Sequence, residues 1–221
     1  MYKTTELFDL EHTIAKDLLS NHEYPWETLK LIKEEILKLA EQLDKNEYKE
    51  IKENVWVHNS AKIADSAFIE GPTIIGKDTE IRHCAYIRGS AIVGEGCVIG
   101  NSCELKNAII FDGCQVPHFN YVGDSILGYK AHMGAGSIVS NIKSDKHNVV
   151  IKDEEENYET NLRKFGAMIG DYVEVGCNSV LNPGTIIGRH SNVYPLARVR
   201  GVVKANSIYK DERKVVEKYD D

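Results

Sequence analysis

The residues best suited to chemistry lie around one histidine near the middle of the chain. His118 belongs to the stretch from Val116 to Asp124, in which Asp124 follows the histidine by six residues. A histidine with a pKa of about 6.5 is the natural general base at neutral pH. A carboxylate that returns on the next strand can orient the imidazole or the groups beside it. A loop histidine alone is usually a solvated surface group, so the setting of His118 is what makes it the candidate catalytic residue.

A six-residue period indicates the elements that must hold His118. Ten consecutive large apolar residues recur at this step, with a small residue such as Ala61, Ala85 or Cys97 four positions after most of them. Neither a helix nor an alternating strand produces this spacing, whereas short strands that turn a corner every six residues do. Three such repeats form one triangular coil of a parallel β-helix, and neighbouring coils stack about 4.8 Å apart. The series is Val57, Ile63, Ile69, Ile75, Ile81, Ile87, Val93, Ile99, Leu105 and Phe111.

Two interruptions divide the predicted β-helix, which covers residues 53–203. The phase slips by four residues after Phe111 and resumes at Tyr121, which predicts an insertion loop at 115–120. The second break, at 141–165, is polar and acidic, and the period returns at Ile169. Insertions in a solenoid project as loops and often carry its function.

The segments on either side of the repeat differ from it in composition. Apolar residues at three- and four-residue steps, among them Leu10, Ile14 and Leu37, predict an α-helical hairpin over residues 1–52, with a break before Pro25. Its apolar face is expected on the first coil or on a partner subunit. The charged tail, 204–221, is expected to be a partly docked helix or a frayed end.

Charge and composition exclude several classes of function. The net charge of −7 offers no basic surface for nucleic acid. No apolar run is long enough to span a membrane, and the acidic start does not resemble a signal peptide. Five cysteines without a Cys-x-x-Cys pair favour reduced thiols and a cytoplasmic location. A single coil has no internal pocket, so flat faces and closed symmetry favour a homotrimer with its sites between subunits.

Residues 118–124, followed by Met133-Gly134-Ala135-Gly136 and Asn141, resemble a known family. They are similar to the acetyltransferase domain of the bifunctional bacterial enzyme that makes UDP-N-acetylglucosamine. The resemblance covers roughly Gly71 to Tyr209. It implies a left-handed coil and transfer of an acetyl group from acetyl-CoA to an amino-sugar phosphate such as glucosamine 1-phosphate. No Gly-rich phosphate loop precedes Val55, so the uridyltransferase half is not expected here.

The resemblance also implies a phosphate clamp. In the family an arginine and a lysine that hold the sugar phosphate precede the catalytic histidine. Here Arg88 lies 18 residues before Lys106, and Lys106 lies 12 before His118. Eighteen residues make one whole coil, so the two cations are expected to stack on the same face. Arg82 occupies the same slot of the repeat, which keeps plain surface charge open as the alternative.

The remaining site residues are assigned from the resemblance alone. His118 would deprotonate the sugar amine, and a backbone N–H of Gly134–Gly136 would hold the oxyanion. Tyr121, His132 and Asn141 are expected to contact the sugar, although the family has an asparagine at the position of His132 and a tyrosine after that of Asn141. The CoA arm is expected along later coils. Its predicted contacts are Ala135, Cys177, Pro195 and Lys210.

Two other functions stay open on the sequence alone. A carbonic anhydrase of the γ class on the same fold would need three histidines converging on zinc, and no close pair occurs among the eight, so no metal is expected. A non-catalytic scaffold or regulatory partner of a separate sugar nucleotidyltransferase would use the helical hairpin instead. The departures from the family at His132 and after Asn141 leave the acceptor open between an amino-sugar phosphate and a nucleotide sugar.

Overall fold

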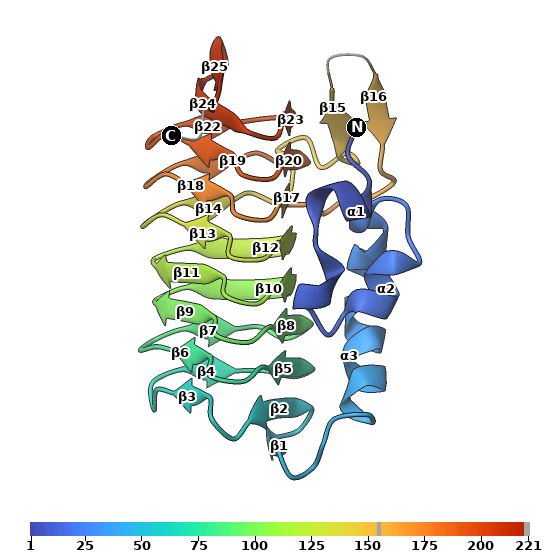
Figure 1. Cartoon of the computed structure of the whole chain (residues 1–221), viewed down its shortest axis with the longest axis vertical. Coiled ribbons are helices and arrows are strands. Elements are labelled where there is room, and N and C mark those ends of the chain that lie inside the picture. Colours follow the sequence, from blue (N-terminus) through green and yellow to red (C-terminus); the bar gives the residue numbers. More distant parts are fainter. Residues whose placement is uncertain (154–155, 219–221) are drawn as a thin grey trace.

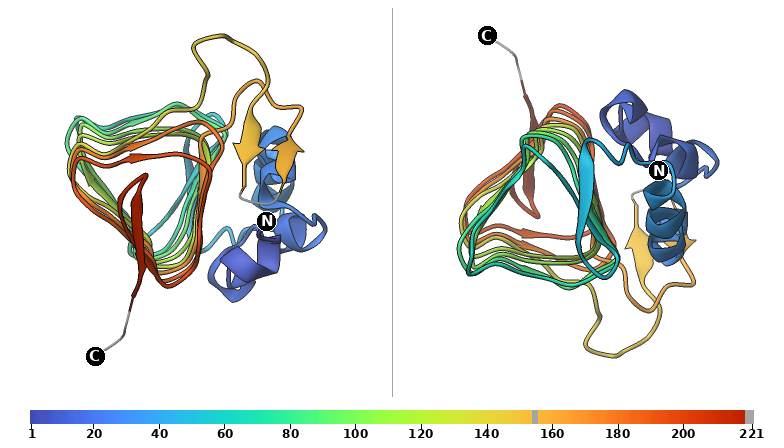
Figure 2. Two further views of the ribbon diagram at one scale, coloured as in Figure 1. Left: turned by 90° about the horizontal axis from the view of Figure 1, so that it is seen from above. Right: turned by 90° about the horizontal axis from the view of Figure 1, so that it is seen from below.

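The computed structural model describes residues 1–153 and 156–218, and its main body is a triangular parallel β-solenoid (Figure 2). Neighbouring coils pair in parallel register, as Thr73 with Ala91 and Ile81 with Ile99 show. The predicted fold class, mainly β with hexapeptide coils, is confirmed. The hand of the coil stays a prediction of the resemblance.

Three faces, named A, B and C here, make up the prism (Figure 1). Face A stacks β2 (Val55–His58), β5 (Thr73–Ile75), β8 (Ala91–Val93), the ends of β10 (Glu104–Ile110) and β12 (Tyr121–Leu127), β17 (Ala167–Ile169), β20 (Thr185–Ile187) and β23 (Val202–Val203). Face B stacks β3 (Lys62–Ile63), β6 (Glu80–Ile81), β9 (Val98–Asn101), β11 (Gln115–His118), β13 (His132–Met133), β18 (Glu174–Val175), β21 (Asn192–Val193) and β24 (Ser207–Asp211). Face C stacks β4 (Phe68–Ile69), β7 (Tyr86–Ile87), the starts of β10 and β12, β14 (Ile138–Val139), β19 (Val180–Leu181) and β22 (Arg198–Val199).

The interior of the solenoid follows the repeat except at the insert, in two coils that are one residue short, and in the last coil, which is two residues short from Ile187 to Val203. Val116 and Val122 are fully buried, and β11 pairs with β9 through Val116 and Ile99. The predicted insertion loop at 115–120 is therefore wrong, because residues 115–118 form a strand. The phase changes on face A, where Ile110 rather than Phe111 is the in-register core residue. Phe111 is buried outside that register, with its ring centre 5.2 Å from that of Phe8. Its position six residues after Leu105 is therefore a coincidence and not part of the interior series.

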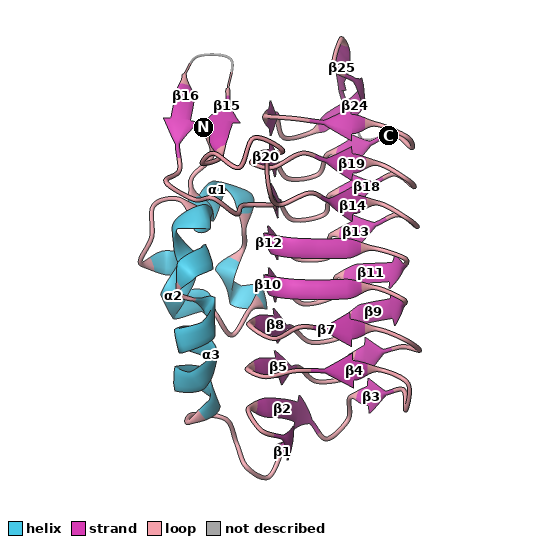
Figure 3. Cartoon of the chain, turned by 180° about the vertical axis from the view of Figure 1, so that it is seen from behind, coloured by secondary structure: helices cyan, strands magenta, loops and turns pink. Residues whose placement is uncertain are grey.

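The N-terminal segment covers face A (Figure 3). It comprises α1 (Thr4–Leu7), α2 (Lys16–Ser20) and α3 (Ile32–Ala40), with 3-10 turns at Leu10–His12 and Pro25–Lys30. These pieces are too short for the predicted two-helix hairpin, and Ile14 and Leu37, expected in its apolar face, are over a third exposed. The last residues before the solenoid form β1 (Tyr48–Lys52), antiparallel to β2. Contacts of α3 with β5, β8 and β10 extend well beyond the first coil.

The break at 141–165 is a folded insert that leaves the solenoid after β14 and returns before β17. It contains the antiparallel hairpin β15 (Val150–Lys152) and β16 (Asn157–Glu159), which lies beside the N-terminal segment (Figure 2). Ring contacts of Trp26 with Phe165 at 6.0 Å and of Tyr24 with Tyr158 at 6.0 Å join the two. The insert and the N-terminal segment therefore pack as one apolar layer.

The C-terminal residues continue the solenoid rather than forming the expected helix or frayed end. β24 pairs with β21, which places Tyr209 above Val193, and β25 (Lys214–Glu217) folds back on β24 as a hairpin. Within the described ranges, 1–153 and 156–218, no helix has the length and apolarity needed to cross a bilayer.

Candidate functional site

One edge of the prism, where face B turns into face C, carries the predicted histidine and most of the predicted CoA residues. We call it the B/C edge. Backbone hydrogen bonds link its coils in order: Gly136 donates to the His118 carbonyl, Asn178 to that of Ala135, and Leu196 to that of Cys177, each at 2.9 Å. Pro195 directly precedes Leu196. The four predicted residues thus form one column along this edge.

The His118 side chain is exposed at the end of β11. Its backbone is fixed, because its N–H donates to Asn120 Oδ1 at 3.0 Å and Asn120 in turn donates to Gly134 O at 2.8 Å. The N–H groups of Gly134 and Gly136 already donate to the carbonyls of Val175 and His118. Within the described part of the chain, only the Ala135 N–H of these three lacks an acceptor, which narrows the oxyanion prediction to that group.

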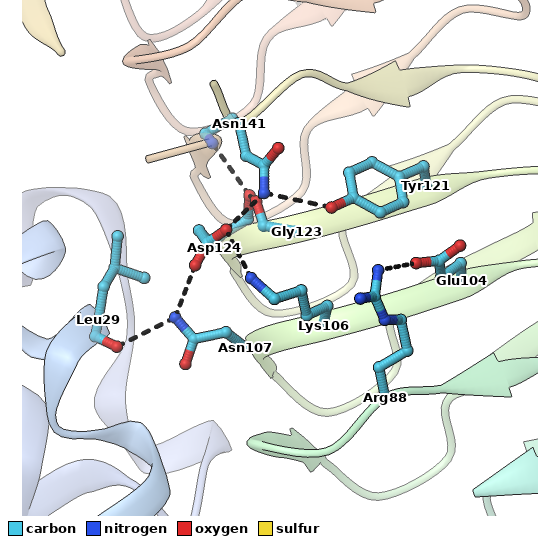
Figure 4. A network of polar contacts seen from close by, with 11 residues as sticks. Leu29, Arg88, Glu104, Lys106, Asn107, Tyr121, Gly123, Asp124 and Asn141 are labelled. Atoms are coloured by element: carbon cyan, nitrogen blue, oxygen red, sulfur yellow. Dashed lines mark hydrogen bonds and ion pairs between the residues drawn. The ribbon is translucent and has the colours of Figure 1, made fainter. Parts of the chain in front are cut away.

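The opposite end of face C carries the predicted clamp, at what we call the C/A edge (Figure 4). Ile87 pairs with Leu105, so Arg88 and Lys106, the next residues, lie on adjacent coils as their spacing predicted. Neither cation is free. Arg88 pairs with Glu104 at 2.7 Å on the surface, and Lys106 Nζ lies 3.4 Å from Asp124 Oδ2.

Asp124 is the centre of a buried polar network at the C/A edge (Figure 4). Its side chain is 7% exposed and accepts hydrogen bonds from Lys106, from Asn107 Nδ2 at 2.9 Å and from Asn141 Nδ2. Asn107 also donates to the Leu29 carbonyl of the N-terminal segment at 3.1 Å. Of the two expected roles of Asp124, orienting the imidazole of His118 is not found within the chain, since the carboxylate holds Lys106, Asn107 and Asn141 instead. Between His118 and Asp124 the chain crosses the whole of face C, from the B/C edge to the C/A edge.

Tyr121 and Asn141, both predicted to bind the sugar, lie in contact. Asn141 Nδ2 donates to the Tyr121 hydroxyl at 3.2 Å. Burial, followed by the charges of Asp124 and Glu104, raises the pKa of Tyr121. Gly123 makes this contact possible, because a Cβ there would lie 2.4 Å from the Tyr121 hydroxyl.

The two remaining predicted residues, His132 and Lys210, lie outside both the His118 column and the network around Asp124. His132 is on face B, where its Nδ1 lies 2.7 Å from Glu174 Oε2, outside the network around Asp124. Lys210 follows the core residue Tyr209 near the top of the B/C edge, with its Nζ 5.1 Å from the centre of the Tyr194 ring. Because Val193 pairs with Tyr209, Lys210 stacks on Tyr194, one position before the column that contains His118.

The regular spacing of 18 residues per coil gave no reason to select Asn107. The signal that identifies it is a 17-residue step: Asn107, Asp124 and Asn141 succeed one another on three coils. That step differs from the regular 18 because each of these coils is one residue short. Among the described residues no group of three or more His, Cys, Asp or Glu side chains has the arrangement of a metal site.

Comparison with known proteins identifies the class to which this architecture is similar. Residues 71–175 match the family model described as the GMPPB C-terminal domain. The resemblance to hexapeptide-repeat sugar acetyltransferases is supported by two curated relatives that match most of this chain. The bifunctional sugar-1-phosphate nucleotidylyltransferase/acetyltransferase of Sulfurisphaera tokodaii is 34% identical over 174 residues, or 71% of this chain and 43% of that protein.

A second relative matches a similar share of this chain, and one solved structure aligns with it more loosely. The bifunctional protein GlmU of Methanococcus aeolicus is 31% identical over 193 residues, or 79% of this chain and 46% of that protein. The chain thus spans less than half the length of both relatives. A hexapeptide transferase family protein from Anaplasma phagocytophilum aligns over 76% of this chain and 81% of its own, with 20% identity and a TM-score of 0.43.

Proposed function

We propose that this protein is a CoA-dependent acyltransferase that acetylates the amino group of an amino-sugar phosphate or nucleotide sugar. The observation that carries the proposal is the column on the B/C edge. An exposed histidine, a backbone N–H without an acceptor at Ala135, and the surface residues Cys177 and Pro195 follow one another along it. An extended pantetheine arm bound along this column would bring its thioester to the histidine.

The clamp must come from a second subunit if it is to serve the same reaction. His118 and Asp124 are six residues apart along extended chain, up to about 20 Å at 3.3 Å per residue, and lie at opposite ends of face C. A homotrimer that packs the C/A edge of one subunit near the B/C edge of the next would close this gap. Face A is already covered, whereas face C exposes Phe68, Ile138 and Val180 by 54%, 41% and 38%. These apolar side chains favour face C as the interface.

The chemistry follows from the groups at the two edges. His118 takes a proton from the sugar ammonium, and the freed amine attacks the thioester carbonyl carbon, forming the C–N bond. The Ala135 N–H stabilises the oxyanion. Collapse of the intermediate breaks the C–S bond, the departing CoA thiolate takes up the proton held by His118, and the nitrogen of the new amide releases its remaining extra proton to solvent. Arg88 and Lys106 hold the acceptor phosphate by charge-assisted hydrogen bonds once it displaces their present carboxylate partners. The cytoplasmic location expected from the cysteines belongs to this proposal.

A thiol-release assay tests the function directly. Acetyl-CoA is incubated with the protein and a panel of amino-sugar 1-phosphates and nucleotide amino sugars, and free CoA is measured. Release that depends on one acceptor supports the proposal. If no acceptor gives release and calorimetry detects no CoA binding, the transferase function is refuted and a scaffold role takes its place.

A further inference from the structure

A second basic site lies on the C/A edge, beyond the residues used above. The insert and the last coils line an open pocket of about 620 Å³ whose wall includes Lys143, Lys152 and Arg200. We call it the insert pocket. Ile142, Val150 and Pro183 form apolar parts of its wall, and Ser140, Ser144 and Asn182 supply polar groups.

The charge of the insert pocket is opposite to that of the protein. Among the described residues of its lining, three cations face one carboxylate, Asp145, on a chain whose net charge is −7. Lys143 is paired, with its Nζ 3.1 Å from Asp145. In the part of the chain that the structure describes, Lys152 and Arg200 have no ion-pair partner. Two cations that keep their charge unpaired beside a concave wall are suited to an anionic ligand.

The insert pocket continues the same column of the solenoid as the clamp. Each residue that directly follows a core residue of face C stacks on the next, in the order Lys106, Gly123, Ser140, Asn182 and Arg200. Four coil steps of about 4.8 Å separate Lys106 from Arg200, or roughly 19 Å in all. Gly123, between the two groups of cations, is covered by the Tyr121 hydroxyl and the Asn141 amide. Asn141 lies between Ser140 and Ile142, so the insert pocket begins where the sugar contacts end.

We propose that the insert pocket binds the nucleoside diphosphate part of the acceptor, and so selects a nucleotide-linked amino sugar over a sugar monophosphate. This inference rests on the proposed function for its source of ligand. The unpaired cations, Lys152 and Arg200, would hold phosphate oxygens, and the apolar wall of Ile142, Val150 and Pro183 would contact the nucleoside. CoA also contains a nucleoside diphosphate, and the proposed trimer brings a neighbour's CoA column close to this edge, but the insert pocket adjoins the predicted sugar contact Asn141 of its own subunit. The acceptor is therefore the expected source.

Calorimetry with UDP, GDP and CoA as separate probes tests the assignment. The test variant is Lys152→Ala/Arg200→Ala. Lys49→Ala/Lys77→Ala is the matched control, because it removes the same charge at exposed positions outside the insert pocket. We expect UDP or GDP to bind the unaltered protein. The test variant should weaken that binding at least about ten-fold and leave CoA affinity unchanged, and the control should change neither.

Three results would overturn the inference. They are no binding of UDP or GDP at millimolar concentration, an equal loss in the control variant, and a loss of CoA affinity in the test variant, which would make the cavity a CoA site. Thiol release with an amino-sugar monophosphate is measured in parallel. Thiol release without nucleotide binding leaves the transferase function standing and removes only this inference. Nucleotide binding without thiol release from any acceptor leaves the nucleotide site standing and removes the transferase function.

Discussion

The carboxylate of Asp124 offers a sharp test of how the C/A edge is built. In Asp124→Asn the side chain keeps its shape but loses its charge, and its new NH₂ group faces a donor, either Asn107 or the pair Lys106 and Asn141. Because the carboxylate is 7% exposed, water cannot replace what is lost. Lys106 is 25% exposed and can be rehydrated, so the loss is mainly that of one charged hydrogen bond at a buried carboxylate, about 2–3 kcal/mol. At about 2–4 °C per kcal/mol for a chain of this size, the Tm should fall by roughly 4–12 °C.

The matched control is Glu104→Gln, which removes the shorter ion pair with Arg88 at 2.7 Å. Both of its members are a third or more exposed, so no measurable change in Tm is expected. Thermal unfolding is followed at one protein concentration, because subunit association also shifts Tm. If Asp124→Asn left the Tm unchanged, or if the Tm fell equally in both variants, the reasoning that burial rather than distance decides the strength of these pairs would be refuted.

Three further predictions address catalysis and pH dependence. His118→Ala should abolish CoA release while the oligomer measured by light scattering stays intact; retained turnover would remove the histidine from the mechanism. Lys106→Ala should raise the KM for the acceptor far more than that for acetyl-CoA, and an equal rise in both would contradict the clamp. Burial raises the pKa of Asp112, so its folded form binds a proton more readily than the unfolded chain and loses stability as pH rises through that pKa. Asp112→Asn removes this loss, so its Tm should exceed that of the unaltered protein at pH 7, and the difference should shrink as pH falls toward 4; a constant difference would contradict the assignment.

The solenoid could be predicted from sequence because one inward residue per strand leaves a regular mark. The same regularity concealed the short coils. Phe111 is apolar and six residues after Leu105, so counting in sixes placed it inside, whereas Ile110 occupies the interior. The N-terminal helices were predicted too long for a similar reason. Apolar residues at helical spacing also arise in short helical turns, and contact with face A decides where each turn ends.

The sequence predicted the positions of site residues that follow from the stacking of coils. It did not predict which side chains those residues contact. The spacing of Arg88 and Lys106 fixed their adjacent positions. The partners that hold them, Glu104 and Asp124, depend on side-chain directions at a corner, for which the period carries no information. The insert was recognised as a break, but its basic cavity forms only when residues near Lys152 and Arg200, distant in sequence, come together.

Complementation between subunits tests the central claim most directly. His118→Ala and Lys106→Ala chains carrying different tags are co-expressed, doubly purified, and assayed for CoA release at an acceptor concentration below KM. Every doubly purified trimer contains both chains, so if a site takes His118 from one subunit and Lys106 from its neighbour, about one site in three should be unaltered, although either variant alone is impaired. Mixed oligomers that recover no activity would contradict an active site shared between two subunits.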